Sequence, residues 1–144
     1  MTLAVPALAR RRRAIRRAAP AVALLAFCVA ACTSVPETTI TSLVSKPLPE
    51  MPGKEGQLIQ VDYGPGATDP VHRHNAHAFV YVLEGSVVMQ VRGGDEVKLT
   101  AGQTFYEGPD DVHVVGRNAS STGSARFLVF LVKNQGAPLL VPEK

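Results

Sequence analysis

Residues 66–85 read GATDPVHRHNAHAFVYVLEG, and residues 102–113 read GQTFYEGPDDVH. These two stretches hold the four histidines of the 144-residue chain, which are His72, His74, His77 and His113. Three of them lie within six residues, and the fourth follows a turn-forming Gly-Pro-Asp-Asp run. Their gathering into two short, glycine-bounded stretches predicts a joint role for the imidazole side chains.

Short β-strands separated by glycine and proline turns are predicted from residue 56 onward. In residues 87–92, for example, Val87, Met89 and Val91 fall on one face of an extended segment. The expected strands are 58–63, 79–83, 87–92, 96–100, 104–107, 112–115 and 126–133. Strands this short, with turns about every eight to twelve residues, predict an all-β sandwich or barrel.

His72 and His74 are predicted to share one metal ion. Side chains two residues apart in an extended segment point the same way, so both imidazoles can reach one ion. A site needs three or four converging ligands, and His113 supplies a third if its strand passes close by. Imidazole nitrogen suits Zn, Cu, Fe and Ni. The expected cofactor is a divalent transition metal (Fe, Mn, Cu, Ni or Zn).

The two histidine stretches resemble the two sequence motifs of the cupin superfamily. The first motif contains a glycine, His-x-His, a glutamate and a second glycine, which correspond here to Gly66, His72, His74, position 78 and Gly85. The second motif separates a glycine from a histidine by ten residues, as Gly102 and His113 are separated. The resemblance implies a double-stranded β-helix, or jelly-roll barrel, over residues 55–144, with His72, His74 and His113 pointing inward as metal ligands.

The chain departs from the cupin pattern at Ala78, where the family has a glutamate. Three alternatives follow from this departure. His77 could swing in as a fourth ligand, although strand alternation aims it at the opposite face. The site could keep three histidines and an open position for water or substrate. It could also have lost strong metal binding.

The side chains around the histidines are expected to form an apolar wall. This wall, or the barrel core, should contain Tyr81, Met89, Phe105 and Phe127. Tyr106 and Glu107 are expected at solvent-exposed edge positions near the mouth of the barrel. The sequence offers no general base beyond the site histidines.

The resemblance leaves more than one function open, because fold does not fix function. The first hypothesis is a metal-dependent enzyme, a dioxygenase or an isomerase, that polarises a small oxygenated substrate. The rival is a non-catalytic module that captures a small ligand or metal at the cell envelope. A purely structural barrel is the third. Single-domain cupins commonly pair through their edges, so a homodimer is expected, with the apolar residues 137–141 contributing.

The first 32 residues read as an export signal. Six arginines within the first seventeen residues precede a short apolar run, 18–31, which ends in Ala-Ala-Cys32. This ending resembles the lipobox of bacterial lipoproteins, which implies lipidation of Cys32, a membrane anchor, and a location in the periplasm or at the outer membrane. An ordinary signal peptide cut near Ala31 is the alternative. Residues 33–54, rich in Thr, Ser and Pro, are expected to be a flexible tether.

The positive charge of the chain belongs to this leader. The whole chain has a net charge of +3, but the residues after position 17 carry nine basic and twelve acidic side chains. No basic face for nucleic acid is therefore expected. Of the two cysteines, Cys28 lies in the apolar run and Cys32 at its end. The expected domain has neither a disulfide nor a thiolate metal site.

Overall fold

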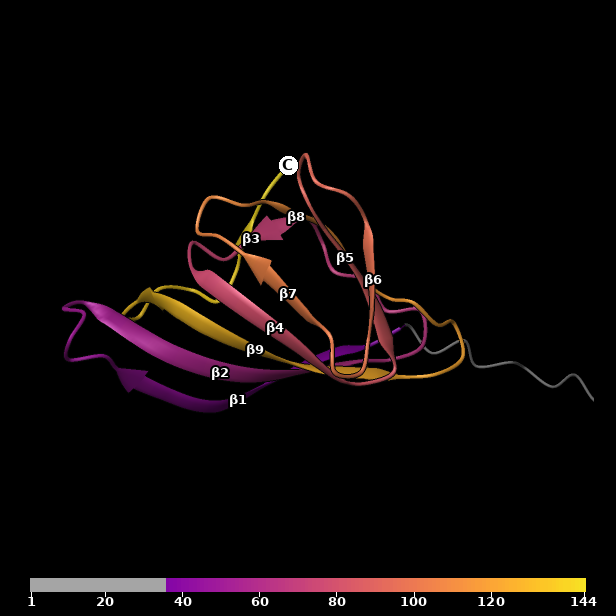
Figure 1. Ribbon diagram of the computed structural model, residues 1–144, viewed down its shortest axis with the longest axis horizontal. Helices are drawn as coiled ribbons and strands as arrows, with labels where there is room; N and C mark the ends of the chain where they lie inside the picture. The colour runs from indigo at the N-terminus through magenta and orange to yellow at the C-terminus, as the bar shows by residue number, and fades with distance from the viewer. Residues whose placement is uncertain (1–35) are drawn as a thin grey trace, which may run out of the picture. The chain divides into compact units, whose positions relative to one another are not determined.

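Two five-stranded antiparallel sheets form the fold in the computed structural model, which describes residues 36–144. The first sheet has the order β1 (Thr38–Pro47), β2 (Lys54–Tyr63), β9 (Ala125–Asn134), β4 (His77–Glu84) and β7 (Thr104–Glu107). The second has the order β10 (Val141–Pro142), β3 (His72–Arg73), β8 (His113–Asn118), β5 (Ser86–Val91) and β6 (Val97–Thr100). Figure 1 shows the first sheet below the second. From β2 to β10 the chain passes back and forth between the two sheets, and only β5 and β6 are consecutive strands of one sheet. The seven strands expected from the sequence are confirmed.

The hydrophobic core lies between the two sheets. Burial alternates along β4 and β9, so every second side chain points inward, as strand geometry requires. Met89 and Phe127 belong to this core, and Phe105 packs against it, as predicted. The prediction for Tyr81 is wrong, because Val80 and Val82 take the inward positions of β4 and leave Tyr81 on the outer face.

The predicted tether is wrong for residues 38–47, which form β1. This strand pairs with β2 from Thr38 opposite Tyr63 to Pro47 opposite Glu55. The described residues, 36–144, group into one unit by their contacts, so the domain begins well before residue 55. The predicted export signal and Cys32 lie outside the described residues. Within residues 36–144, no helix is long and apolar enough to cross a membrane.

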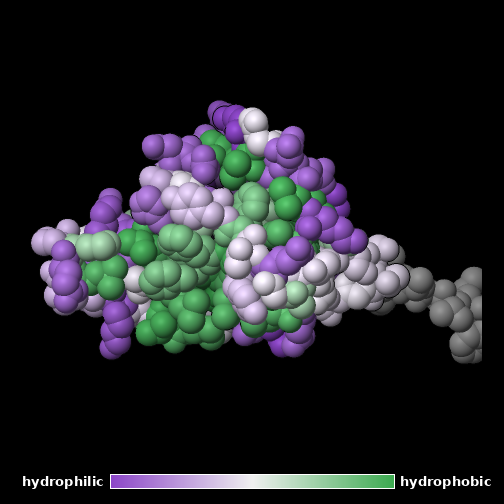
Figure 2. All heavy atoms as spheres, in the orientation of Figure 1, coloured by the Kyte–Doolittle hydropathy of each residue, from purple (hydrophilic) through white to green (hydrophobic). Residues whose placement is uncertain are grey.

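An aromatic cluster lies on the outer face of the first sheet. Phe79 of β4 contacts Tyr106 of β7 and Phe130 of β9, with ring centroids 5.2 and 6.5 Å apart. All three side chains are exposed. Apolar side chains gather over β4, β9 and β2 in Figure 2. Exposed apolar patches of this kind commonly mark contact surfaces.

Candidate metal centre

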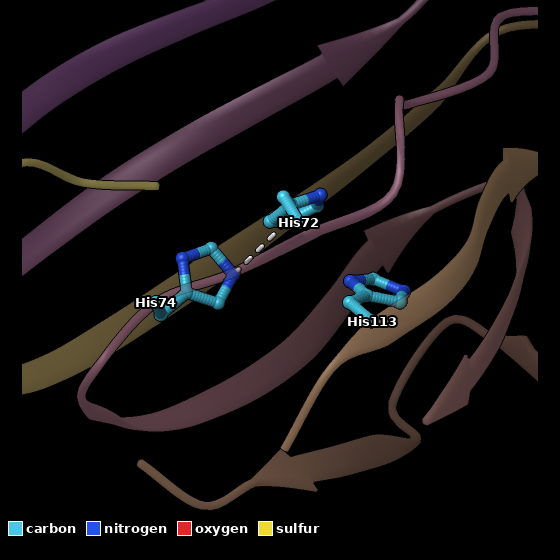
Figure 3. Close-up of side chains that lie close together, drawn as sticks. All are labelled: His72, His74 and His113. Carbon is cyan, nitrogen blue, oxygen red and sulfur yellow. Dashed lines mark hydrogen bonds between the residues drawn. The ribbon is translucent and has the colours of Figure 1, made fainter. Parts of the chain in front are cut away.

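Two neighbouring strands bring three histidines together. His72 lies on β3 directly opposite His113, the first residue of β8. His74 follows β3 by one residue and points to the same side as His72, as the spacing predicted. Asn75, with a φ of 49°, then turns the chain toward β4; asparagine tolerates this left-handed conformation better than most residues. The three rings converge in Figure 3.

The hydrogen bonds of His72 and His74 leave both Nε2 atoms facing each other. Nδ1 of His72 donates to the carbonyl oxygen of Pro70 (2.7 Å), and Nδ1 of His74 donates to that of Leu139 (2.6 Å). A carbonyl can only accept, so each Nδ1 carries a hydrogen and each Nε2 of a neutral ring presents a lone pair. The two Nε2 atoms are 3.3 Å apart. Lone pairs at this distance repel unless a cation or a proton lies between them.

His113 completes a donor set that fits a transition metal. It is 4% exposed, and neither of its ring nitrogens has a hydrogen-bond partner among the described residues. Burial, with His72 nearby as the second cause, lowers the pKa of His113 to about 4, so its ring is neutral at pH 7. One nitrogen from each of the three histidines lies within 4.8 Å of the others. Three imidazoles in this arrangement suit a divalent ion.

Glu107 is the site residue that the sequence prediction missed. It was expected at a solvated edge, but it is 2% exposed. Its Oε1 lies 3.4 Å from Nδ1 of His113 and its Oε2 lies 3.8 Å from Nε2 of His74. Burial, reinforced by the carboxylates of Asp111 and Asp69, raises the pKa of Glu107 to about 7. Glu107 is paired across the strands with Ala78, the position of the absent family glutamate.

His77 does not join the other three histidines. It is exposed at the start of β4, on the same outer face as Phe79, and Nδ1 of its ring lies 2.7 Å from the hydroxyl of Tyr106. Strand alternation explains this position, because Ala78 takes the inward place. The possible role of His77 as a fourth ligand therefore finds no support in the geometry.

A cavity of about 60 Å³ adjoins the three histidines and Glu107. This volume has room for a few water molecules or one small organic molecule. The cavity wall is mostly apolar and includes Val80, Met89, Phe127, Val129 and Leu139. Its other polar groups are Tyr63, whose hydroxyl donates to the carboxylate of Asp69, and Asp69 itself. Burial, with Asp69 as a further cause, raises the pKa of Tyr63 and keeps its hydroxyl protonated.

The C-terminal segment closes one side of the site. Leu139 packs against the core, lines the cavity and holds His74 through its carbonyl oxygen. Val141 of β10 pairs with Arg73 of β3, beside His72. These contacts place residues 139–141 against their own domain, although residues 137–141 were expected to contribute to a dimer contact.

Deletion of residues 138–144 is expected to weaken metal binding by about 10- to 100-fold, the usual cost of losing a partner that orients a ligand histidine. The reason is the loss of the carbonyl group that fixes the tautomer of His74. Competition with a coloured chelator measures the affinity. Deletion of residues 143–144 is the control, because it removes the Arg73–Glu143 ion pair and keeps Leu139. Unchanged affinity after the longer deletion would contradict the role of Leu139.

Solved structures with the same fold support the architecture. An uncharacterised protein with a double-stranded β-helix domain from Klebsiella pneumoniae matches at 16% identity and a TM-score of 0.59, covering 75% of this chain and 86% of that one. An oxalate oxidase in complex with the substrate analogue glycolate matches at 25% identity and a TM-score of 0.56, with coverages of 72% and 54%. The DMSP lyase DddQ from Ruegeria pomeroyi DSS-3 matches at 18% identity and a TM-score of 0.53, covering 60% of this chain and 42% of that one.

This chain spans about half of the oxalate oxidase and less than half of the lyase. No curated protein matches the sequence significantly. The predicted double-stranded β-helix is confirmed by the two antiparallel sheets and by these neighbours. The pattern of the cupin domain family matches residues 59–131, a range that includes the three histidines and Glu107. The chain therefore belongs to the cupin domain family.

Proposed function

We propose that the chain binds one divalent transition metal through His72, His74 and His113 and uses it to hold a small oxygenated molecule. The observation that carries this proposal is the pair of Nε2 atoms 3.3 Å apart, each with its Nδ1 committed to a carbonyl oxygen. A cation between them would convert a repulsive contact into two coordinate bonds. His113 is buried nearby, and neither of its nitrogens has a hydrogen-bond partner within residues 36–144.

The cavity supports a small, anionic or chelating ligand. Three neutral imidazoles cancel none of the positive charge of the ion, and one nearby carboxylate, that of Glu107, cancels only part of it, which favours an anion. The small cavity volume excludes a large substrate, and the apolar wall would exclude bulk water from the ligand. An oxalate oxidase of the same fold holds glycolate, a small hydroxy acid. When bound, the metal would polarise an oxygen atom of such a ligand as a Lewis acid.

If the protein is an enzyme, we propose that it catalyses dioxygenation or isomerisation of the bound molecule. Tyr63 and Asp69 would then supply the remaining polar groups of the cavity, with the Tyr63 hydroxyl held by the carboxylate of Asp69. A non-catalytic binding module is the alternative. Export, a lipid anchor on Cys32 and a homodimer stay predictions.

Elemental analysis of the purified protein beside a His72→Ala/His74→Ala variant tests the proposal. The wild type is expected to hold near-stoichiometric Fe, Mn, Cu, Ni or Zn, and the variant is expected to hold less than a tenth of that amount. A His77→Ala variant is the control and should keep the metal, because His77 lies on the outer face. Absence of metal from the wild type after reconstitution would refute the proposal. Retained metal without oxygen consumption or turnover would favour the binding module.

A further inference from the structure

We propose that Glu107 is the fourth metal ligand and that it replaces, from the neighbouring strand, the glutamate that Ala78 lacks. This inference rests on the proposed metal function of the three histidines. It concerns a residue of β7, outside the His-x-His stretch and at a different position from the family glutamate. The carboxylate would enter the site from β7 rather than from β4.

The strand register explains how the carboxylate can change strands. Ala78 and Glu107 are directly paired across β4 and β7. Paired residues in an antiparallel sheet have Cβ atoms about 4.5–5.5 Å apart and point to the same face. Both residues are buried, at 0% and 2% exposure. The methyl group of Ala78 leaves space on this face that the longer side chain of Glu107 can use.

Most of the interatomic distances fit those between ligands of one ion. Two donor atoms, each about 2.1 Å from a metal, lie about 3.0 Å apart in octahedral and about 3.4 Å apart in tetrahedral geometry. Oε1 of Glu107 is 3.4 Å from Nδ1 of His113, and Oε2 is 3.8 Å from Nε2 of His74. Nε2 of His74 is in turn 3.3 Å from Nε2 of His72. Oε1 of Glu107 therefore lies at the spacing of two ligands of one ion, whereas Oε2 lies farther from His74 than either geometry sets, so a small shift of the carboxylate toward the imidazole cluster would complete the site.

Burial without partners distinguishes a ligand from a group that only orients His113. An orienting role would use one carboxylate oxygen, as acceptor of a hydrogen bond from the ring. Oε2 of Glu107 would then remain buried without a partner, which costs about 1–3 kcal/mol or more for a charged group. Among the described residues, three of the four buried side-chain polar atoms that lack a hydrogen bond belong to Glu107 and His113. One cation would satisfy atoms of both residues.

A carboxylate ligand also favours a divalent ion over Cu(I). Three neutral imidazoles and one carboxylate leave a net charge of +1 around a divalent ion. Oxygen ligands suit Mn and other hard ions, whereas thiolate or thioether ligands select Cu(I). The donor set therefore favours Mn(II), Fe(II) or Zn(II) over Cu(I).

A crystal structure of the full chain loaded with Zn²⁺ tests the inference directly. A carboxylate oxygen of Glu107 is expected within about 2.2 Å of the ion, alongside the three histidines. Zinc held by the histidines with both Glu107 oxygens beyond about 3 Å would overturn the inference and leave the proposed metal function intact. Failure of the wild type to take up zinc or any other metal would overturn both.

Zinc affinity in matched variants provides the second test. Glu107→Gln keeps the shape of the side chain and is expected to bind zinc at least 100-fold more weakly. Glu84→Gln, the same change at an exposed position of β4, should bind like the wild type. Ala78→Glu/Glu107→Ala returns the carboxylate to the family position and should recover affinity to within about tenfold, which an orienting role would not allow. A loss below tenfold in Glu107→Gln would overturn the inference.

Discussion

In the metal-free protein, Glu107→Gln is expected to raise the free energy of unfolding at pH 8 by about 3 kcal/mol. Burial raises the pKa of Glu107 from an ordinary value of 4.5 to about 7. At pH 8 the carboxyl group is ionised in both the folded and the unfolded chain, and the folded chain carries the cost of the buried charge. Glutamine has nearly the same shape and removes that cost.

The difference in stability between the wild type and Glu107→Gln should grow as pH rises. Between pH 4.5 and 7 the folded chain holds a proton on Glu107 that the unfolded chain releases, so this group lowers the stability of the wild type as pH rises. At pH 4.5 the group is protonated in the folded chain and half protonated in the unfolded chain, so the two proteins should differ little there and still less at lower pH. Urea unfolding at pH 4.5, 6 and 8, with a chelator present, measures the difference. A difference that stays constant with pH would contradict the assignment.

His113 has the opposite effect on the pH dependence of the free energy of unfolding. Its pKa is lowered from 6.5 to about 4, chiefly by burial. The folded ring stays neutral at pH 5 while the unfolded ring takes up a proton, so stability is lost as pH falls from about 6.5 toward 4. The contributions of His113 and Glu107 oppose each other between pH 4.5 and 6.5. Glu107→Gln should therefore expose a steeper loss of stability in acid.

Bound metal should reverse the order of stability, so that the wild type becomes more stable than Glu107→Gln. A cation beside Glu107 offsets the buried charge, so saturating zinc is expected to stabilise the wild type more than the glutamine variant. A ligand present at a thousandfold excess over its Kd adds about 4 kcal/mol to the free energy of unfolding. A carboxylate that destabilises the empty protein and stabilises the loaded one is typical of a functional residue retained at a cost in stability.

The sequence predicted the longer strands that bury a face and missed three strands: β1, which buries none, and the two-residue strands β3 and β10. Residues 58–63 and 126–133 were identified because apolar side chains and flanking turns mark them. All but one residue of β1 are exposed, and this strand pairs only with β2 at the edge of its sheet. Its stabilisation comes from the backbone ladder, which leaves no apolar alternation in residues 38–47. A Thr- and Ser-rich segment of this kind reads as a tether.

The histidine site was predictable, whereas its carboxylate was not. The two-residue spacing of His72 and His74 and the later His113 carried the prediction, because strand alternation places them on one side. Glu107 enters the site only because β7 pairs with β4 in the register that sets it opposite Ala78. No local pattern encodes that register. The missing family glutamate was the available signal, and a search for a carboxylate on the paired strand could have found Glu107.

Gly85→Ala is expected to lower the free energy of unfolding by about 2–5 kcal/mol, the sum of a left-handed backbone penalty and a steric one. Gly85 has a φ of 71°. A Cβ atom here would lie 2.9 Å from Cα of Ala125 and closer still to the carbonyl oxygen of Ser124. Both neighbours are backbone atoms, so no side-chain rotation can relieve the contact. Urea unfolding measures the loss.

Gly102→Ala separates the two parts of this penalty. Gly102 has a φ of 86°, but a Cβ atom there would meet no atom within 4 Å. Its substitution should cost only the backbone penalty, about 1–2 kcal/mol. Equal losses in the two variants would contradict the close approach of Gly85 to Ser124 and Ala125. Both glycines belong to the cupin motifs, yet of the two only Gly85 has a packing role. It lets the β4–β5 turn pass against the start of β9, the strand that pairs with β4 on the side opposite β7.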